Sequence, residues 1–198
     1  MKSTLLVAVL AAVFSIVIST AASCQVMPER APKVQTGPVY KNSAFLGWGY
    51  TSLNQVNGSR SGLQGVTGSY GRDISDHFGV VVDAAHYAWD VTASNPDNPS
   101  VDQFLVGGQV RANLYEKLGG FARGLIGTVH TGGVQIQPGY SFAGGVGIGM
   151  DYNHSARWAI RAGGDIIGSA FTLVPYQSGN STHTRWNARA QIGVVVHF

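Results

Sequence analysis

The side chains that could do acid–base chemistry in this sequence are its six histidines: His77, His86, His130, His154, His183 and His197. Hydrolysis by an activated serine needs a histidine within hydrogen-bond reach of the serine and an acid that orients the ring. His154 and Ser155 are neighbours in sequence, but consecutive residues of a strand face opposite ways, which argues against a hydrogen-bonded pair. We therefore expect no enzymatic activity, with a lipid-modifying enzyme kept as an alternative.

Metal and cofactor chemistry find no better support. No two histidines have ligand spacing on one face, and the single cysteine, Cys24, lies outside the strand-like part of the chain. The glycines of 144–149 alternate within a strand pattern, where glycine permits close packing, so they do not indicate a nucleotide-binding loop. We expect neither a metal nor a cofactor.

Isolated charges are the remaining chemical feature. They lie singly on the polar side of segments that are otherwise apolar or small. These residues are Asp83, Arg111, Arg123, Asp151, Arg161, Asp165, Arg185 and Arg189. The formal net charge of +3 does not indicate a nucleic-acid partner, because the basic residues form no cluster and binding would need a basic face.

The segments that carry these charges alternate with period two. In 185–198, Trp186 and Ile192 share one face while Asn187 and Gln191 share the other. Alternation over about ten residues is the pattern of a membrane β-strand. Eight such strands are predicted, at 43–53, 62–72, 78–89, 103–115, 120–130, 141–152, 158–171 and 185–198.

Segment 120–130 fits the pattern least well, because placing Arg123 on the inner face places Phe121 and Leu125 there too. The connections alternate in length. Tight turns are expected at 73–77, 116–119 and 153–157, and longer loops at 54–61, 90–102, 131–139 and 172–183. Outer-membrane barrels have short periplasmic turns and longer extracellular loops, so eight strands with three turns and four loops fit that class.

The start of the chain predicts export. Lys2 precedes an apolar stretch over 5–18, and small residues follow over 20–23, which is the pattern of a secretory signal peptide. We expect cleavage after Ala22, giving a signal peptide at 1–22, a periplasmic lead-in at 23–40 and a barrel at 41–198. Residues 21–24 resemble a lipoprotein box that lacks its usual leucine, so Cys24 is a possible lipidation site, although an unmodified cysteine is the interpretation we favour.

Composition supports β-structure in lipid. Charged residues are 12% of the chain against about 25% in globular proteins, and 27 of 198 residues are glycine. After the signal peptide no apolar run reaches the roughly 18 residues of a spanning helix. A soluble ligand-binding barrel of lipocalin type would also alternate, with its faces exchanged. The small residues and isolated charges of the polar face argue against it, and Gly47-Trp48 has the wrong spacing for the lipocalin signature.

The chain resembles the small eight-stranded outer-membrane barrels, typified by the OmpA transmembrane domain, OmpX and the opacity proteins. The resemblance covers 41–198 in architecture, and its most specific element is the alternating last strand that ends His197-Phe198. It implies an all-β, antiparallel, up-and-down transmembrane barrel in the bacterial outer membrane, in contact with outer-membrane lipids. It also implies that the barrel-assembly machinery reads the apolar face of that strand: Ile192, Val194, Val196 and Phe198.

An eight-stranded barrel has an interior just wide enough for side chains to fill. Buried charges there must pair, because desolvation of an unpaired charge is costly. We therefore expect an Arg–Asp network that plugs the lumen, with a narrow ion channel as the alternative. The role is then structural, or contact with an unidentified extracellular partner. The candidate contact residues near the loops are Arg60, Tyr87, Trp89, Tyr140, Tyr176 and His183.

Overall fold

A computed structural model describes residues 40–54, 60–90, 99–132, 138–169 and 185–198. The expected signal peptide, lead-in and Cys24 lie outside these residues, as do Tyr176 and His183. Eight strands make up the described chain. They are β1 (Asn42–Asn54), β2 (Arg60–Asp73), β3 (Phe78–Asp90), β4 (Ser100–Tyr115), β5 (Leu118–Gly132), β6 (Gly139–Asn153), β7 (Trp158–Ser169) and β8 (Arg185–His197).

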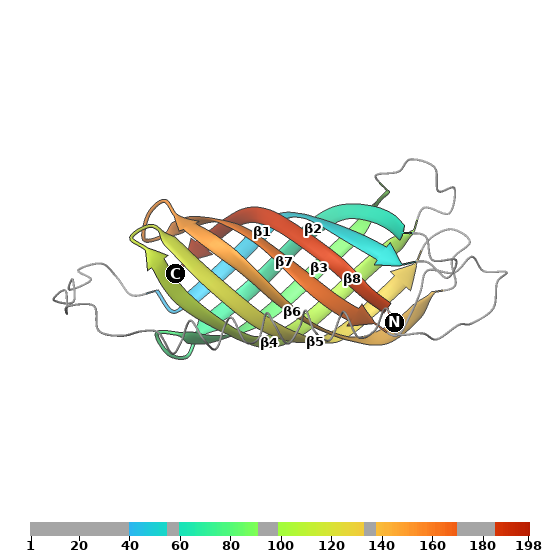
Figure 1. The fold of residues 1–198 in the computed structure, drawn as a ribbon, viewed down its shortest axis with the longest axis horizontal. Coiled ribbons are helices and arrows are strands. Elements are labelled where there is room, and N and C mark those ends of the chain that lie inside the picture. Colours follow the sequence, from blue (N-terminus) through green and yellow to red (C-terminus); the bar gives the residue numbers. More distant parts are fainter. Residues whose placement is uncertain (1–39, 55–59, 91–98, 133–137, 170–184) are drawn as a thin grey trace, which may run out of the picture. The chain divides into compact units, whose positions relative to one another are not determined.

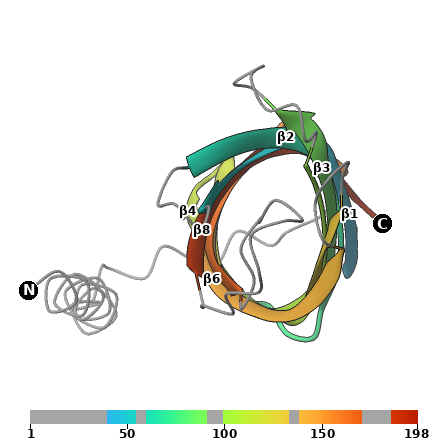
Figure 2. The ribbon, with the colours of Figure 1, turned by 90° about the vertical axis from the view of Figure 1, so that its right-hand side faces the viewer.

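The strands pair in sequence order and close on themselves. Each strand is antiparallel to its neighbours, and β1 pairs with β8 from Ser43↔His197 to Ser52↔Ala188. Figure 1 shows the strands tilted along the barrel, and Figure 2 shows the ring that they form. The predicted fold class, a closed eight-stranded antiparallel barrel, is confirmed, and each strand begins and ends within three residues of the predicted bounds. In the part of the chain that the structure describes, no helix is long and apolar enough to cross a membrane.

The turns β2–β3 and β6–β7 share one construction. Ser75 and Ser155 occupy the same place in them, and each serine hydroxyl accepts a hydrogen bond from a backbone N–H at the start of the next strand, at 3.1 Å. These are the N–H groups of Phe78 and Trp158. Serine side chains bond to nearby backbone in this way more readily than they support a strand, which explains why the sequence turns here. Both turns lie at the end of the barrel where the chain ends in Figure 1.

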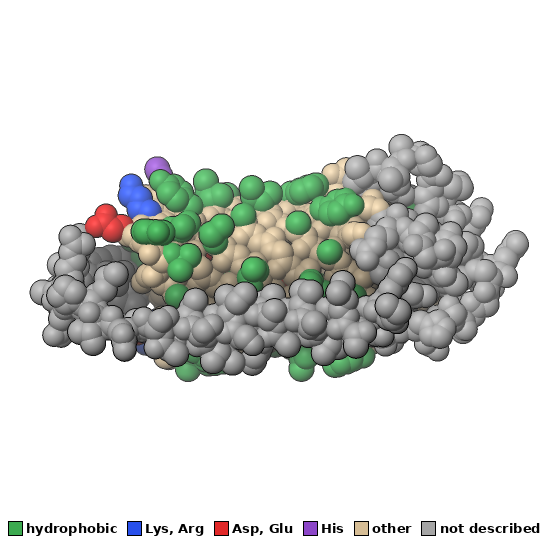
Figure 3. Space-filling view, in the orientation of Figure 1, with side chains coloured by type: hydrophobic (Ala, Val, Ile, Leu, Met, Phe, Trp, Pro, Cys, Tyr) green, Lys and Arg blue, Asp and Glu red, His purple; other side chains and the backbone are tan. Residues whose placement is uncertain are grey.

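The alternation of the sequence sorts side chains to the two faces of the wall. Large apolar residues such as Leu46, Phe104 and Ile148 lie exposed on the outward face. Figure 3 shows such side chains spread over the wall, with the charged side chains of this view gathered at one end. The segment that fitted least, β5, alternates as well: Phe121, Arg123 and Leu125 all lie buried on the inner face.

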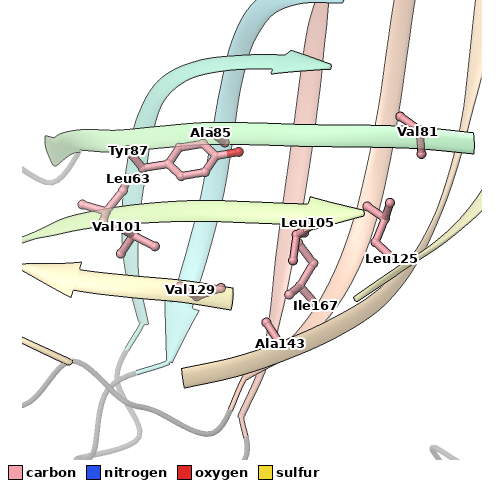
Figure 4. Close-up of a cluster of buried hydrophobic side chains, with 10 residues drawn as sticks. All are labelled: Leu63, Val81, Ala85, Tyr87, Val101, Leu105, Leu125, Val129, Ala143 and Ile167. Carbon is pink, nitrogen blue, oxygen red and sulfur yellow. The ribbon is translucent and has the colours of Figure 1, made fainter. Parts of the chain in front are cut away.

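The inner face therefore combines apolar and charged residues. Ten buried apolar side chains from β2 to β7 form one cluster (Figure 4): Leu63, Val81, Ala85, Tyr87, Val101, Leu105, Leu125, Val129, Ala143 and Ile167. A smaller cluster joins Phe45, Ala159 and Val195. Buried polar residues also occupy the inner face, so the interior is filled with side chains.

Candidate functional site

Four of the isolated charges meet in the lumen. Asp83 comes from β3, Arg123 from β5, Asp165 from β7 and Arg189 from β8, and their side chains are 0–1% exposed. Because β3 and β7 lie four strands apart in a closed ring of eight, Asp83 and Asp165 belong to opposite sides of the barrel. We call these four residues the lumen ring.

The lumen ring is closed by hydrogen-bonded ion pairs. Arg123 donates to both carboxylate oxygens of Asp165, each at 2.8 Å, and to Asp83 at 3.2 Å. Arg189 donates to Asp165 at 2.8 Å and to Asp83 at 2.6 Å, and it also reaches the Gln103 amide oxygen at 3.2 Å. Each carboxylate therefore accepts hydrogen bonds from both guanidinium groups. Two positive and two negative charges compensate one another in a site that is buried from bulk solvent.

Two further pairs continue the charged interior. Arg161 and Asp151 face each other directly on β7 and β6 and form two hydrogen bonds of 2.7 Å. The Arg161 guanidinium also lies 4.6 Å from the centre of the Phe121 ring, which is close enough for a cation–π interaction. Arg111, closer to the turns, donates to Asp73 at 3.0 Å and to Ser43 at 3.3 Å.

Glycine on β6 makes room for this arrangement. A Cβ atom at Gly147 would overlap the Asp165 carboxylate, and one at Gly149 would meet the Phe121 ring. Gly147 and Gly149 thus leave space in the lumen for side chains from neighbouring strands.

Of the eight predicted interior charges, the structure brings four into the lumen ring and pairs Asp151 with Arg161. Arg111 pairs with Asp73, a residue that the sequence did not single out. Gln103 is a second unpredicted partner. The side chain of Arg185 is not among those described. The pairings within the lumen ring depend on which strands lie opposite each other, and no local spacing in the sequence carries that information. Asp151 and Arg161 differ, because they are direct partners across the β6–β7 turn.

Of the predicted contact residues, the structure describes the side chains of Tyr87 and Tyr140. Tyr87 is fully buried in the apolar cluster, so its assignment as a contact residue is wrong. It faces the lumen because it has the same parity on β3 as Asp83 and Ala85. Tyr140 is 81% exposed. The side chains of Arg60 and Trp89 lie outside the described residues, like the whole of Tyr176 and His183.

On the outward face the structure assembles a cluster that the sequence left scattered. His86 and Asp102 are 2.6 Å apart, and His130 lies 3.5 Å from the other oxygen of Asp102. The three residues come from β3, β4 and β5, and only the strand register unites them. Among the described residues, no group of three or more His, Cys, Asp or Glu side chains has the geometry of a metal site.

The last strand completes the barrel. Phe198 exchanges two backbone hydrogen bonds with Asn42, of 2.9 and 3.1 Å, and its ring centre lies 6.4 Å from that of Tyr70. Ile192, Val194 and Phe198 are exposed on the outward face, and Val196 is half-buried there.

Comparison with known proteins shows which solved structures share this fold. No protein-family model and no curated protein matches the chain. Among solved structures, Neisserial surface protein A matches with a TM-score of 0.63 and 12% identity, over 79% of this chain and 97% of that one. Ail, the attachment invasion locus protein of Yersinia pestis, matches with a TM-score of 0.54 and 12% identity, over 81% of this chain and 100% of Ail.

The N-terminal β-barrel domain of OprF from Pseudomonas aeruginosa gives a TM-score of 0.50 and 12% identity, over 80% of this chain and 98% of that domain. At these identities the likeness concerns the fold. The chain has the fold of the small eight-stranded outer-membrane barrels, and the resemblance inferred from its sequence is confirmed at that level.

Proposed function

We propose that this protein is an exported bacterial outer-membrane barrel with a closed lumen, which acts as an envelope scaffold or makes surface contacts through its loops. Outer-membrane lipids surround it, and the barrel-assembly machinery reads Ile192, Val194, Val196 and Phe198. The apolar outward face supports the membrane location. Side chains such as Leu46, Phe142 and Ile148 are each at least two-thirds exposed, which in water would form an apolar surface far larger than soluble proteins tolerate.

The lumen ring is the observation that supports a closed barrel. A conducting pore needs a continuous polar path, but here Asp83 and Asp165 on opposite walls are joined through both arginines. The apolar cluster adds a second obstacle, because Tyr87, Leu105 and Leu125 fill the lumen beside the ring. The ring also presents no free nucleophile or base, which favours a non-enzymatic role.

Planar-bilayer recording tests this proposal. The purified protein is first shown to be folded by its shift in gel mobility on boiling. We then expect no discrete conductance steps from the wild-type protein or from Asp76→Ala, whose charge lies in the β2–β3 turn. Steps in the wild type that change in Asp165→Ala would contradict a closed lumen and support the narrow channel instead.

A further inference from the structure

A row of polar side chains crosses the outward face of four strands. His86, Asp102, His130 and Tyr140 are direct partners across β3, β4, β5 and β6. The His86 Nδ1 atom forms a hydrogen bond with Asp102 at 2.6 Å, and the His130 Nδ1 atom lies 3.5 Å from the other oxygen of that carboxylate. The His130 and Tyr140 rings are in contact, tilted by 41°, with their centres 4.3 Å apart. The side chains of His86 and Asp102 are 58% and 52% exposed, so the row is open to a ligand.

Two grooves adjoin this row and share Asp102. The larger, of about 590 Å³, follows β2 and β3, where the small residues Gly68 and Ala84 lie between larger apolar ones. Its apolar lining includes Val66, Tyr70 and Val82. The smaller groove, of about 200 Å³, is more polar and is lined by Asp102, Phe104, Thr128, His130 and Tyr140. An apolar groove beside a smaller, more polar and aromatic one matches the two parts of an amphiphile, its acyl chain and its polar headgroup.

The position of the row indicates the depth at which that amphiphile binds. Phe104 and Phe142 lie two residues nearer the turns on the same face as Asp102 and Tyr140. Among outward strand side chains that the structure describes, Asp102 is the one carboxylate. A charge on the lipid face is costly at mid-membrane and nearly neutral at the interface, so the row belongs at headgroup level, beyond an aromatic girdle.

We propose that the row and its two grooves bind a glycolipid, with an acyl chain in the β2–β3 groove and the sugar headgroup against Asp102, His130 and Tyr140. This inference rests on the membrane location proposed above. Sugar hydroxyls can donate to the Asp102 carboxylate and bond to the second ring nitrogen of each histidine, which Asp102 leaves unused. The exposed Tyr140 ring offers an apolar face to the sugar. A phosphate group would instead meet the negative charge of Asp102.

Native mass spectrometry of the barrel released from nanodiscs tests the proposal. The nanodiscs contain equal amounts of a glucosyl diacylglycerol, a phosphatidylglycerol and a phosphatidylethanolamine with the same acyl chains. We expect the wild-type protein to retain the glucosyl lipid preferentially and Asp102→Asn to lose about tenfold of that preference, as for the loss of a hydrogen bond to a charged group. Ala84→Leu fills the apolar groove that is proposed to hold the acyl chain, so it should reduce the amount of glucosyl lipid that the protein retains.

Matched controls keep the test specific. Asp76→Asn removes a turn carboxylate at the other end of the barrel, and Ala162→Leu enlarges an outward alanine on β7, so both should behave as wild type. Equal retention of the three lipids, a preference for either phospholipid, or a glucosyl preference that survives Asp102→Asn would overturn the glycolipid site while leaving the barrel in the membrane. A protein that does not enter nanodiscs would overturn the proposed function, and this inference with it.

Discussion

At the scale of single residues, the lumen ring is a set of charges that depend on one another. Each carboxylate accepts from both Arg123 and Arg189, so no member can be removed without leaving the others unbalanced. Replacing a whole buried ion pair by apolar residues is often tolerated, whereas breaking one by removing a single partner is strongly destabilising. The ring therefore couples four strands through electrostatics as well as through the backbone.

Removal of Asp165 should show this dependence. Asp165→Ala leaves two buried guanidinium groups with Asp83 as their shared carboxylate, and we expect it to lower the free energy of unfolding by about 3–5 kcal/mol. The measurement is urea unfolding of the protein refolded into phospholipid vesicles, followed by tryptophan fluorescence. Asp76→Ala, which removes an exposed turn carboxylate, is the control. A loss for Asp165→Ala no larger than the control's would contradict the coupling.

At the scale of elements, period-two alternation predicted the strands. A shift of one residue would exchange the two faces of a strand, so the alternating pattern fixes which side chains share a face. It predicted β4 less completely: the strand begins at Ser100, before the clear alternation starts at 103. It also could not pair the charges. Whether Arg123 reaches Asp83 or Asp165 depends on barrel closure and on side chains that cross the lumen. The His86–Asp102–His130 cluster was not predicted for a different reason: it depends on the exact register of three neighbouring strands, and its two histidines are 44 positions apart.

The glycines of β6 provide an element-scale prediction. Gly147→Ala places a methyl group against the Asp165 carboxylate, so we expect overpacking to lower the free energy of unfolding by about 1–3 kcal/mol. Gly124→Ala on β5 is the matched control, because a Cβ there has nothing within 4 Å, and its effect should stay within about 0.5 kcal/mol. Both are measured by the same vesicle assay. Equal stability of the two variants would show that the ring adjusts freely around β6.

At the scale of the whole molecule, the barrel has two different ends. Short turns built on Ser75 and Ser155 close one end, and the outward polar row around Asp102 marks the wall near the other. The interior between these ends contains the Arg111–Asp73 pair, the Arg161–Asp151 pair, the lumen ring and the apolar cluster. Because the two ends differ, the orientation expected of an outer-membrane barrel can be tested directly.

Single-cysteine labelling tests that orientation. In a Cys24→Ser background, Pro138→Cys introduces a thiol at the exposed loop end of β6, and Ala156→Cys introduces one in the exposed β6–β7 turn. Outer-membrane barrels place long loops outside the cell and short turns in the periplasm. A membrane-impermeant maleimide applied to intact cells should therefore label Pro138→Cys and leave Ala156→Cys unlabelled until the outer membrane is permeabilised. The reverse pattern would invert the barrel and place the Asp102 row at the periplasmic leaflet, whereas equal labelling of both sites would argue against a membrane-spanning location.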